Sequence, residues 1–410
     1  MKDPKTTILL ITGILLISTG MICNEWFLIP LLSSDGTIAT RNRIIIWTFD
    51  LLIILVGLSF IICRHYLKQE NALLLGFTIS FCFILFVLPD CLSASMFFLK
   101  ILLRHTFLVS KNHIFIQDNH LGWKPKANSI RNAISKGNFD VLYEIDQDGF
   151  RKINNTEKPD FSIYFFGDSF TFGNGVSNKD SFPAIIKGKY VKDNINVYNA
   201  GVSGYGIVQM FQRFLNIEYR IKPGDLIVFT PLADDIRRNI KDFYFPYHLY
   251  YLQVESFEYF PYFDEGVIKY HKMENSLHTK FKVIVLEAPV TGRFWRSLNK
   301  HFISDTTEES IEMMKIIKLR TEMKGARFVL FFLPETGECL NKNYAVDVSG
   351  FEYFDIMRFF PSQKQELDKL KFSKREGHWN AYGHEIAAKA IVETLINNKV
   401  IDKKYLKEMP

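Results

Sequence analysis

The sequence has 410 residues, of which 48% are hydrophobic and 23% are charged, and its formal net charge at pH 7 is +6. This small charge is not gathered in any Lys/Arg run, so the composition argues against a disordered chain and against a nucleic-acid-binding protein. Four of the five cysteines lie in the apolar N-terminal part, and no Cys/His spacing suggests zinc, so we expect neither a disulfide framework in the remainder nor a metal or cofactor.

The N-terminal part of the chain is predicted to cross a membrane. Apolar runs cover residues 8–32, 44–63 and 72–88, and each approaches the roughly 20 residues that a helix needs to span a bilayer. The apolar stretch 92–104 is interpreted as an interfacial or re-entrant helix. Residues 1–105 are therefore expected to form a multi-pass membrane region of about three transmembrane helices plus this helix. Basic residues are divided evenly between the two sides, so charge leaves the orientation open.

Alternating strand and helix patterns follow the membrane region. Short apolar runs predict strands at residues 161–166, 196–199, 226–230 and 327–333. Helical patterns alternate with them at 182–191, 207–219, 308–324 and 384–397. This alternation predicts a parallel sheet with helices on both faces, in which function gathers at the carboxyl ends of the strands. We interpret residues 106–160 as a linker and lead-in, 161–400 as a soluble α/β domain, and 401–410 as a C-terminal tail.

The first predicted strand ends at the tripeptide Gly167-Asp168-Ser169. A serine at a strand-to-helix turn projects its hydroxyl above the sheet, and its backbone N–H lies near a helix N-terminus, where it can stabilise an oxyanion. By itself the tripeptide is more often an ordinary turn. Its meaning depends on whether the chain also supplies a base.

A candidate base, His378, precedes the last predicted helix, and Glu376 stands two residues before it. A serine hydroxyl needs a base at neutral pH, and the base needs a third group that fixes its tautomer. A lone histidine would more often be structural. The serine, histidine and carboxylate together predict a nucleophile, a general base and the residue that orients the base.

In four blocks the chain resembles the SGNH/GDSL hydrolase family. The blocks lie, in the family's order and at predicted strand ends, at residues 167–170, 199–204, 232–236 and 377–380. The resemblance covers about residues 146–400 and includes Asp148-Gly149-Phe150-Arg151, which is typical of bacterial members with N-terminal spans. It implies a three-layer α/β/α, flavodoxin-like domain with a parallel sheet, preceded here by transmembrane helices.

The resemblance also implies acyl transfer as the mechanism. Ser169 would attack an ester carbonyl, and His378 would act first as base and then as acid. Glu376 would orient His378. The backbone N–H groups of Ser169 and Gly204 would hold the oxyanion.

The third block departs from the family at Asp234, because members carry an asparagine there whose side chain donates to the oxyanion. An ionised carboxylate about 3 Å from an oxyanion would repel it by roughly 5 kcal/mol at an effective dielectric near 20. Asp234 is therefore predicted to be protonated, turned away, or a cause of weak hydrolysis. Asp168, Asn199 and Asp235 are expected to support the site.

The segment 242–270 is an insertion with an unusual density of aromatic residues. These are Phe243, Tyr244, Phe245, Tyr247, Tyr250, Tyr251, Phe260, Tyr262 and Phe263. Two interpretations stay open: a sugar-stacking platform over the site, or a β-hairpin with a small core of its own. Residues 261–266 are predicted to be the turn of such a hairpin.

The sequence thus predicts a membrane-anchored serine esterase or O-acyltransferase that acts on acyl, mainly acetyl, esters of a cell-envelope glycan. The two-residue spacing of Glu376 and His378 resembles that of proteins that acetylate alginate and related polysaccharides. The expected partners are an acylated glycan or other ester, the lipid bilayer and a membrane acyltransferase, with no nucleic acid. The catalytic domain is expected outside the cytoplasm, in the periplasm or at the cell surface. The alternative, favoured by Asp234, is a weak or inactive module of the same fold that binds glycan or partner proteins during polysaccharide assembly.

Overall fold

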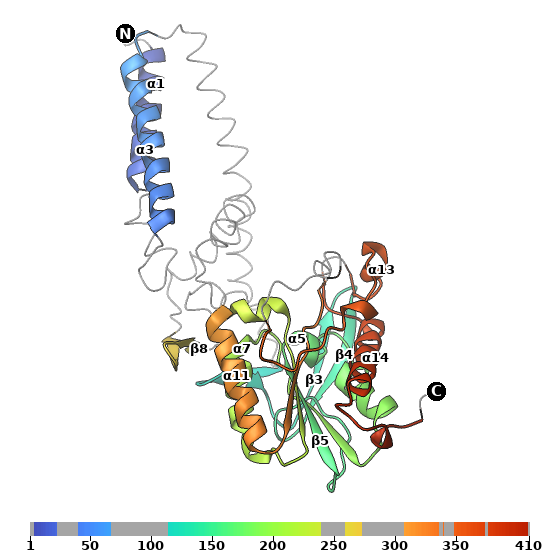
Figure 1. Ribbon diagram of the computed structural model, residues 1–410. Helices are drawn as coiled ribbons and strands as arrows, with labels where there is room; N and C mark the ends of the chain where they lie inside the picture. Colours follow the sequence, from blue (N-terminus) through green and yellow to red (C-terminus); the bar gives the residue numbers. More distant parts are fainter. Residues whose placement is uncertain are drawn as a thin grey trace. The chain divides into compact units, whose positions relative to one another are not determined.

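The computed structural model of the chain contains two compact units (Figure 1). The helical unit comprises residues 1–110, 241–243 and 274–304, and the α/β unit comprises residues 111–240, 244–273 and 305–410. The structure describes residues 4–22, 40–66, 114–238, 259–272, 307–335, 339, 348–373 and 376–408.

The helical unit contains two helices that pack closely against each other, α1 (Pro4–Ile22) and α3 (Thr40–Cys63). They touch through glycines. A Cβ atom on Gly13 would lie 2.7 Å from the carbonyl oxygen of Gly57, and one on Gly57 would lie 2.8 Å from the carbonyl oxygen of Gly13. Any larger residue at either position would push the two backbones apart.

Among the residues that the structure describes, no helix is long and apolar enough to cross a membrane. The transmembrane helices predicted at 8–32 and 44–63 are therefore not supported by α1 and α3, the helices described there. The predicted third span at 72–88 and the interfacial helix at 92–104 lie outside the described residues.

The α/β unit is built on a parallel sheet, as predicted. Its strands are β5 (Phe161–Gly167), β6 (Ile195–Asn199), β7 (Leu226–Thr230) and β10 (Arg327–Leu330). They lie in the order β10-β7-β5-β6, with Gly167 of β5 opposite Thr230 of β7. Strand β6 lies on one side of β5, and β7 lies on its other side, so the direction in which strands are added reverses after β6. The carboxyl ends of β5 and β7 therefore form a topological switch point, where ligands bind in open α/β sheets.

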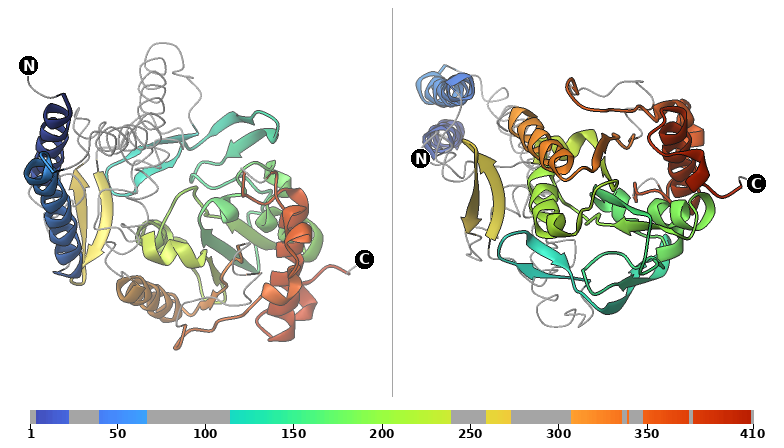
Figure 2. Two further views of the ribbon diagram at one scale, coloured as in Figure 1. Left: turned by 90° about the horizontal axis from the view of Figure 1, so that it is seen from above. Right: turned by 60° about the horizontal axis from the view of Figure 1, so that its bottom comes forward.

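Helices cover both faces of this sheet, which confirms the three-layer α/β/α architecture (Figures 1 and 2). Alternate side chains of β5 show why. Ile163 and Phe165 are buried with α6 (Phe182–Ile185) and α14 (Ala381–Asn397), whereas Tyr164 and Phe166 are buried with α7 (Ile207–Ile217) and α11 (Thr307–Met323). A strand that is apolar on both faces has to be covered on both faces.

Short helical turns make most of the remaining connections. They are α5 (Ser169–Phe172), α13 (Lys364–Asp368), the π-helical turn η2 (Ile186–Tyr190), and the 3₁₀ turns η1 (Asn178–Asp180), η3 (Glu218–Arg220), η4 (Ala233–Arg238), η6 (Met357–Phe359) and η7 (Lys403–Tyr405). The predicted helix at 182–191 is thus α6 followed by a wider turn.

The segment 106–160, interpreted from sequence as a linker and lead-in, is folded into the α/β unit where it is described. It forms two antiparallel pairs, β1 (Phe115–Asp118) with β2 (Gly122–Pro125) and β3 (Ser129–Ser135) with β4 (Phe139–Ile145). Trp123, Tyr143 and Phe150 from this segment are buried in the same core as α7 and α11. The segment is therefore a structural part of the unit.

The described part of the aromatic insertion is a β-hairpin, β8 (Tyr259–Asp264) with β9 (Val267–Lys272). Its turn is Glu265-Gly266, with φ angles of 52° and 78°, so the turn predicted at 261–266 starts too early because its first four residues belong to β8. Phe260 and Phe263 are buried in the core of the unit, so the hairpin does not have a separate core. The aromatic residues from 243 to 251 lie outside the described residues.

Candidate active site

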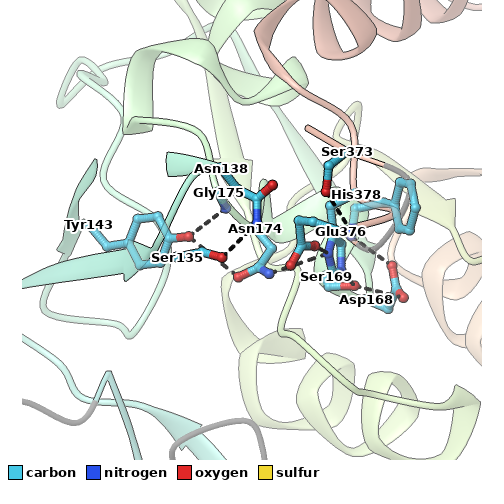
Figure 3. Close-up of polar contacts among 11 residues, drawn as sticks. Ser135, Asn138, Tyr143, Asp168, Ser169, Asn174, Gly175, Ser373, Glu376 and His378 are labelled. Carbon is cyan, nitrogen blue, oxygen red and sulfur yellow. Dashed lines mark hydrogen bonds and ion pairs between the residues drawn. The ribbon is translucent and has the colours of Figure 1, made fainter. Parts of the chain in front are cut away.

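Ser169 lies at the carboxyl end of β5, at the switch point of the sheet (Figure 3). Asp168 caps the short helix α5, because its Oδ1 accepts the N–H of Phe170 at 2.9 Å. At the other end of α5, the N–H of Gly173 donates to the Ser169 carbonyl at 3.0 Å, and Gly173 has a φ of 80°. The tight turn thus holds the Ser169 backbone from both sides and leaves its hydroxyl at the edge of the sheet.

His378 and Glu376 meet Ser169 at this edge. The Nε2 atom of His378 lies 2.8 Å from the Ser169 Oγ, and its Nδ1 makes a short hydrogen bond with Glu376 Oε1. This hydrogen bond lowers the pKa of Glu376, so the carboxylate stays ionised at neutral pH and favours the tautomer with the hydrogen on Nδ1. Nε2 is then free to accept the Ser169 hydrogen, which is the geometry of a nucleophile with an oriented base.

Local packing fixes the position of His378 just before α14. Asn380 caps α14, since its Oδ1 accepts the N–H groups of Tyr382 and Gly383. Trp379 is buried, and its ring lies 4.9 Å from the ring of Phe170. The Phe170 ring also lies 5.2 Å from the imidazole of His378. The residue after the nucleophile thus packs directly against the base.

Asp168 gives the Ser169 hydroxyl a second acceptor, because its Oδ2 lies 3.2 Å from Oγ. The hydroxyl has one hydrogen, and the contact with His378 is the shorter of the two. Asp168 is 1% exposed, so this carboxylate, predicted as a supporting residue, is enclosed beside the nucleophile as well as capping α5.

Gly204, the predicted oxyanion-hole glycine, lies in the turn after β6 and has a φ of 81°. Asn199 ties this turn to α5. Its Nδ2 donates to the Thr171 carbonyl at 2.8 Å, and its Oδ1 accepts the N–H of Gly201 at 3.1 Å. A Cβ atom on Gly201 would lie 2.5 Å from the Phe172 nitrogen, so only glycine permits this approach. Asn199 therefore supports the site by holding the turns of Ser169 and Gly204 together.

Asp234 and Asp235 follow β7 in the turn η4, at the same edge of the sheet. Asp235 is fully buried, and its Oδ2 accepts the N–H of Leu232 at 2.8 Å. It is thus a structural support of the turn. The Asp234 backbone is placed by this turn, and its side chain lies outside what the structure describes.

The sequence pattern did not reveal the role of Arg151, which is 1% exposed and lies behind the Ser169 turn. Its Nε and Nη2 donate to Asn178 Oδ1, and its remaining N–H groups donate to the backbone carbonyls of residues 172, 173 and 176. Its guanidinium lies 4.3 Å from the ring centroid of Tyr143. Burial lowers the pKa of Arg151 to about 10. The signal in the sequence was a single arginine at the end of the motif Asp148-Gly149-Phe150-Arg151.

Within the described part of the chain, no group of three or more His, Cys, Asp or Glu side chains could hold a metal ion. The polar groups that meet at the Ser169 edge are a hydroxyl, an imidazole and carboxylates. Such a set can perform nucleophilic substitution at an acyl carbon with general acid–base assistance.

The chain matches no protein-family model and no curated protein. Among solved structures it is similar to a member of the lipolytic protein G-D-S-L family from Veillonella parvula, with 14% identity and a TM-score of 0.33 over 57% of this chain and 97% of that one. A protein of the G-D-S-L family from Desulfitobacterium hafniense has 17% identity and a TM-score of 0.31, over 56% and 98%. A candidate acylhydrolase from Bacteroides fragilis has 12% identity and a TM-score of 0.32, over 61% and 93%.

The α/β unit places the elements of the sequence resemblance as that resemblance predicts. They are a parallel sheet in the order β10-β7-β5-β6, the Gly167-Asp168-Ser169 turn after β5, and His378 before α14. Residues 199–204 and 232–236 follow β6 and β7, where the second and third family blocks belong.

Proposed function

We propose that this protein is a serine esterase or O-acyltransferase of the SGNH/GDSL type. The observation that carries the proposal is the 2.8 Å contact between Ser169 Oγ and His378 Nε2, with Glu376 bonded to the other ring nitrogen. A serine, a histidine and a carboxylate in this order define the acyl-transfer triad on unrelated folds. Here they meet at the edge of the sheet where α/β enzymes bind their substrates.

In the proposed reaction, His378 Nε2 takes the Ser169 hydroxyl proton as Oγ attacks the ester carbonyl carbon. The resulting tetrahedral intermediate collapses when the ester C–O bond breaks, and the imidazolium gives its proton to the leaving oxygen. Water or a sugar hydroxyl then attacks the acyl-serine, with His378 again as base. Glu376 remains ionised throughout and stabilises the imidazolium.

The proposed oxyanion donors are the backbone N–H groups of Ser169 and Gly204. Asp234 stands where the family has a donating asparagine, and the loss of one such donor typically lowers kcat by about 10²–10³-fold. This observation favours the second candidate function, a weak or inactive SGNH-fold module that binds glycan or partner proteins. The complete Ser169–His378–Glu376 arrangement favours the enzyme.

The proposed substrate class is an acyl ester, above all an acetyl ester, of a cell-envelope glycan. It is supported by the two-residue spacing of Glu376 and His378, which resembles that of polysaccharide-acetylating proteins. A membrane acyltransferase as acyl donor and a location at the membrane, with the α/β unit outside the cytoplasm, are further parts of the proposal that rest on the sequence. Recovery of the full chain in a salt-washed membrane fraction tests the location.

Labelling with a fluorophosphonate probe tests the enzyme proposal, because the probe phosphonylates an activated serine. We expect labelling of the folded protein, loss of labelling in Ser169→Ala, and full labelling in Ser162→Ala. Ser162 is a buried serine at the opposite end of β5 and is the matched control. If the folded wild-type protein is not labelled, the enzyme proposal is wrong and the binding module is the remaining candidate function.

A second assay separates hydrolysis from transfer. Turnover of 4-nitrophenyl acetate is measured with and without an oligosaccharide acceptor. A hydrolase releases acetate in both cases, whereas a transferase accelerates with the acceptor and yields an acetylated sugar.

A further inference from the structure

We infer that Tyr143 and Asn174 are positioning residues for His378, held in place by Arg151. This inference rests on the proposed function, because it concerns how the general base of that reaction is kept in line with Ser169. None of the three residues belongs to the four motif blocks of the chain. They come from β4, from the end of the Ser169 turn, and from the end of the lead-in segment.

Asn174 is the first of the two contacts that reach His378 from outside its own loop. The backbone N–H of Asn174 donates to the Ser169 carbonyl at 2.9 Å, so its position is set directly by the nucleophile's residue. Its side-chain Nδ2 lies 3.5 Å from His378 Nδ1, the ring nitrogen that faces Glu376 (Figure 3). Because Nδ1 already donates its hydrogen to Glu376, the amide makes a packing contact with this edge of the imidazole and not a hydrogen bond. This contact limits rotation of the ring away from Ser169.

Tyr143 decides which end of the Asn174 amide faces His378. The Tyr143 hydroxyl accepts the N–H of Gly175 at 2.6 Å, so its own hydrogen is available to donate. The Oδ1 atom of Asn174 lies 3.4 Å from this hydroxyl. With Oδ1 turned to a donor, the NH₂ end is directed toward His378. Tyr143 is 1% exposed, so water does not compete for this arrangement.

Arg151 immobilises both residues from behind. Its guanidinium holds the backbone carbonyls of residues 172, 173 and 176, which flank Asn174, and it lies over the Tyr143 ring. The backbone of Arg151 bridges Ile145 at the end of β4 and Asn199 at the end of β6. A single buried side chain therefore connects the Ser169 turn, the β3–β4 hairpin and the sheet.

The charge of the neighbours gives this arrangement a measurable consequence. Among the described residues, the titratable groups around His378 include Glu376, which contacts its ring, His384 on α14, Asp168 beside Ser169, and Tyr143 on β4. Glu376 is the carboxylate that contacts the imidazole, and Asn174 is neutral. A carboxylate in place of Asn174 would add a second negative charge beside Nδ1 and favour the imidazolium, the form that cannot act as base.

The test compares four variants of the full chain in ester hydrolysis across pH. Tyr143→Phe and Asn174→Ala are expected to lower kcat about tenfold with little change in KM, because the base is misaligned while the acyl site is kept. Asn174→Asp is expected to move the acid limb of the kcat/KM profile to higher pH by about one unit. The control is Tyr198→Phe on β6. It also removes a tyrosine hydroxyl that accepts an amide N–H, here from the side chain of Asn196. The pH profile of this variant should match that of the wild type.

The inference is overturned if Tyr143→Phe and Asn174→Ala behave like Tyr198→Phe, or if Asn174→Asp leaves the acid limb in place. An inactive wild-type protein would instead remove the proposed function. In that case, the NMR signals of the His378 ring ¹⁵N atoms still test the positioning role of Tyr143 and Asn174. They should shift in Asn174→Asp and stay unchanged in Tyr198→Phe, and equal spectra in both variants would overturn the positioning role.

Discussion

On the acid–base side of the candidate site, Ser169 and His378 are 209 residues apart in the chain and meet through their side chains. On the proposed oxyanion side, Ser169 and Gly204 would offer backbone N–H groups from turns that follow the neighbouring strands β5 and β6. The geometry of the acid–base side depends on the identity of its side chains. The geometry of the oxyanion side depends on the contacts that hold the two turns in place. The acid–base side is therefore sensitive to its side chains directly, whereas the oxyanion side is sensitive to the residues that hold the two turns and to the side chain at position 234.

Two buried arginines extend this contrast. Arg151 supports the acid–base side with five hydrogen bonds, whereas Arg213 supports the turn after β6 by donating to the carbonyls of Ala200 and Gly149, each at 2.8 Å. Both have a pKa lowered by burial. Among the described residues, neither guanidinium forms an ion pair with a carboxylate, so each charge is solvated mainly by carbonyl groups.

The largest effect is expected from His378→Ala. Loss of the general base should lower kcat for ester hydrolysis by about 10⁴–10⁶-fold, because Oγ then has to lose its proton without assistance. His120→Ala is the control and should retain activity, because His120 is an exposed histidine in the turn between β1 and β2. Comparable turnover in the two variants would contradict the assignment of the acid–base side.

The next effect concerns stability and compares the two arginines. Arg151→Met removes five hydrogen bonds, to three backbone carbonyls and to Asn178 Oδ1, so the free energy of unfolding should fall by about 3–5 kcal/mol. Arg213→Met leaves two carbonyls and should cost about half as much. Urea unfolding measures both. If Arg213→Met loses more unfolding free energy than Arg151→Met, the prediction that Arg151 stabilises the fold more than Arg213 is wrong.

On the oxyanion side, Asp234→Asn should raise ester turnover by about 10²-fold, because it restores a donor where the family has one and removes a negative charge. The neighbouring variant Asp235→Asn serves as control, since Asp235 is buried against the N–H of Leu232 and should affect stability without raising turnover. Unchanged turnover in Asp234→Asn would show that Asp234 does not limit the oxyanion hole.

The smallest effect is a pH dependence of stability on the acid–base side. Burial lowers the pKa of His384 to about 3, so between this value and the ordinary pKa near 6.5 the unfolded chain binds more protons than the folded one. The contribution of His384 is thus complete above the unfolded value and is lost as pH falls, by about 2 kcal/mol between pH 7 and pH 5. Urea unfolding of wild type and His384→Gln at both pH values measures it; equal acid losses would exclude His384 as the cause.

Sequence patterns predicted the sheet of the α/β unit well, because buried parallel strands need continuous apolar runs that stand out between amphipathic helices. They also singled out Ser169, His378 and Glu376, whose side chains lie together at one edge of the sheet. They failed for the segment around 114–145, where short strands with exposed faces resemble a linker. They also left the insertion at 242–270 between a sugar-stacking platform and a hairpin with its own core, since a local pattern does not show that Phe260 stacks against Trp123.

The sequence by itself determined the fold class, the position of the candidate nucleophile and the identity of its candidate base, because these depend on local periodicity and on motifs with a fixed order. Only the tertiary structure decided that Tyr143, Arg151 and Asn174 gather behind His378. Their contacts join segments whose spacing along the chain carries no regular signal, and each residue type is common elsewhere. Side-chain direction and burial, which give these residues their role, exist only once the hairpin, the Ser169 turn and the sheet have packed together.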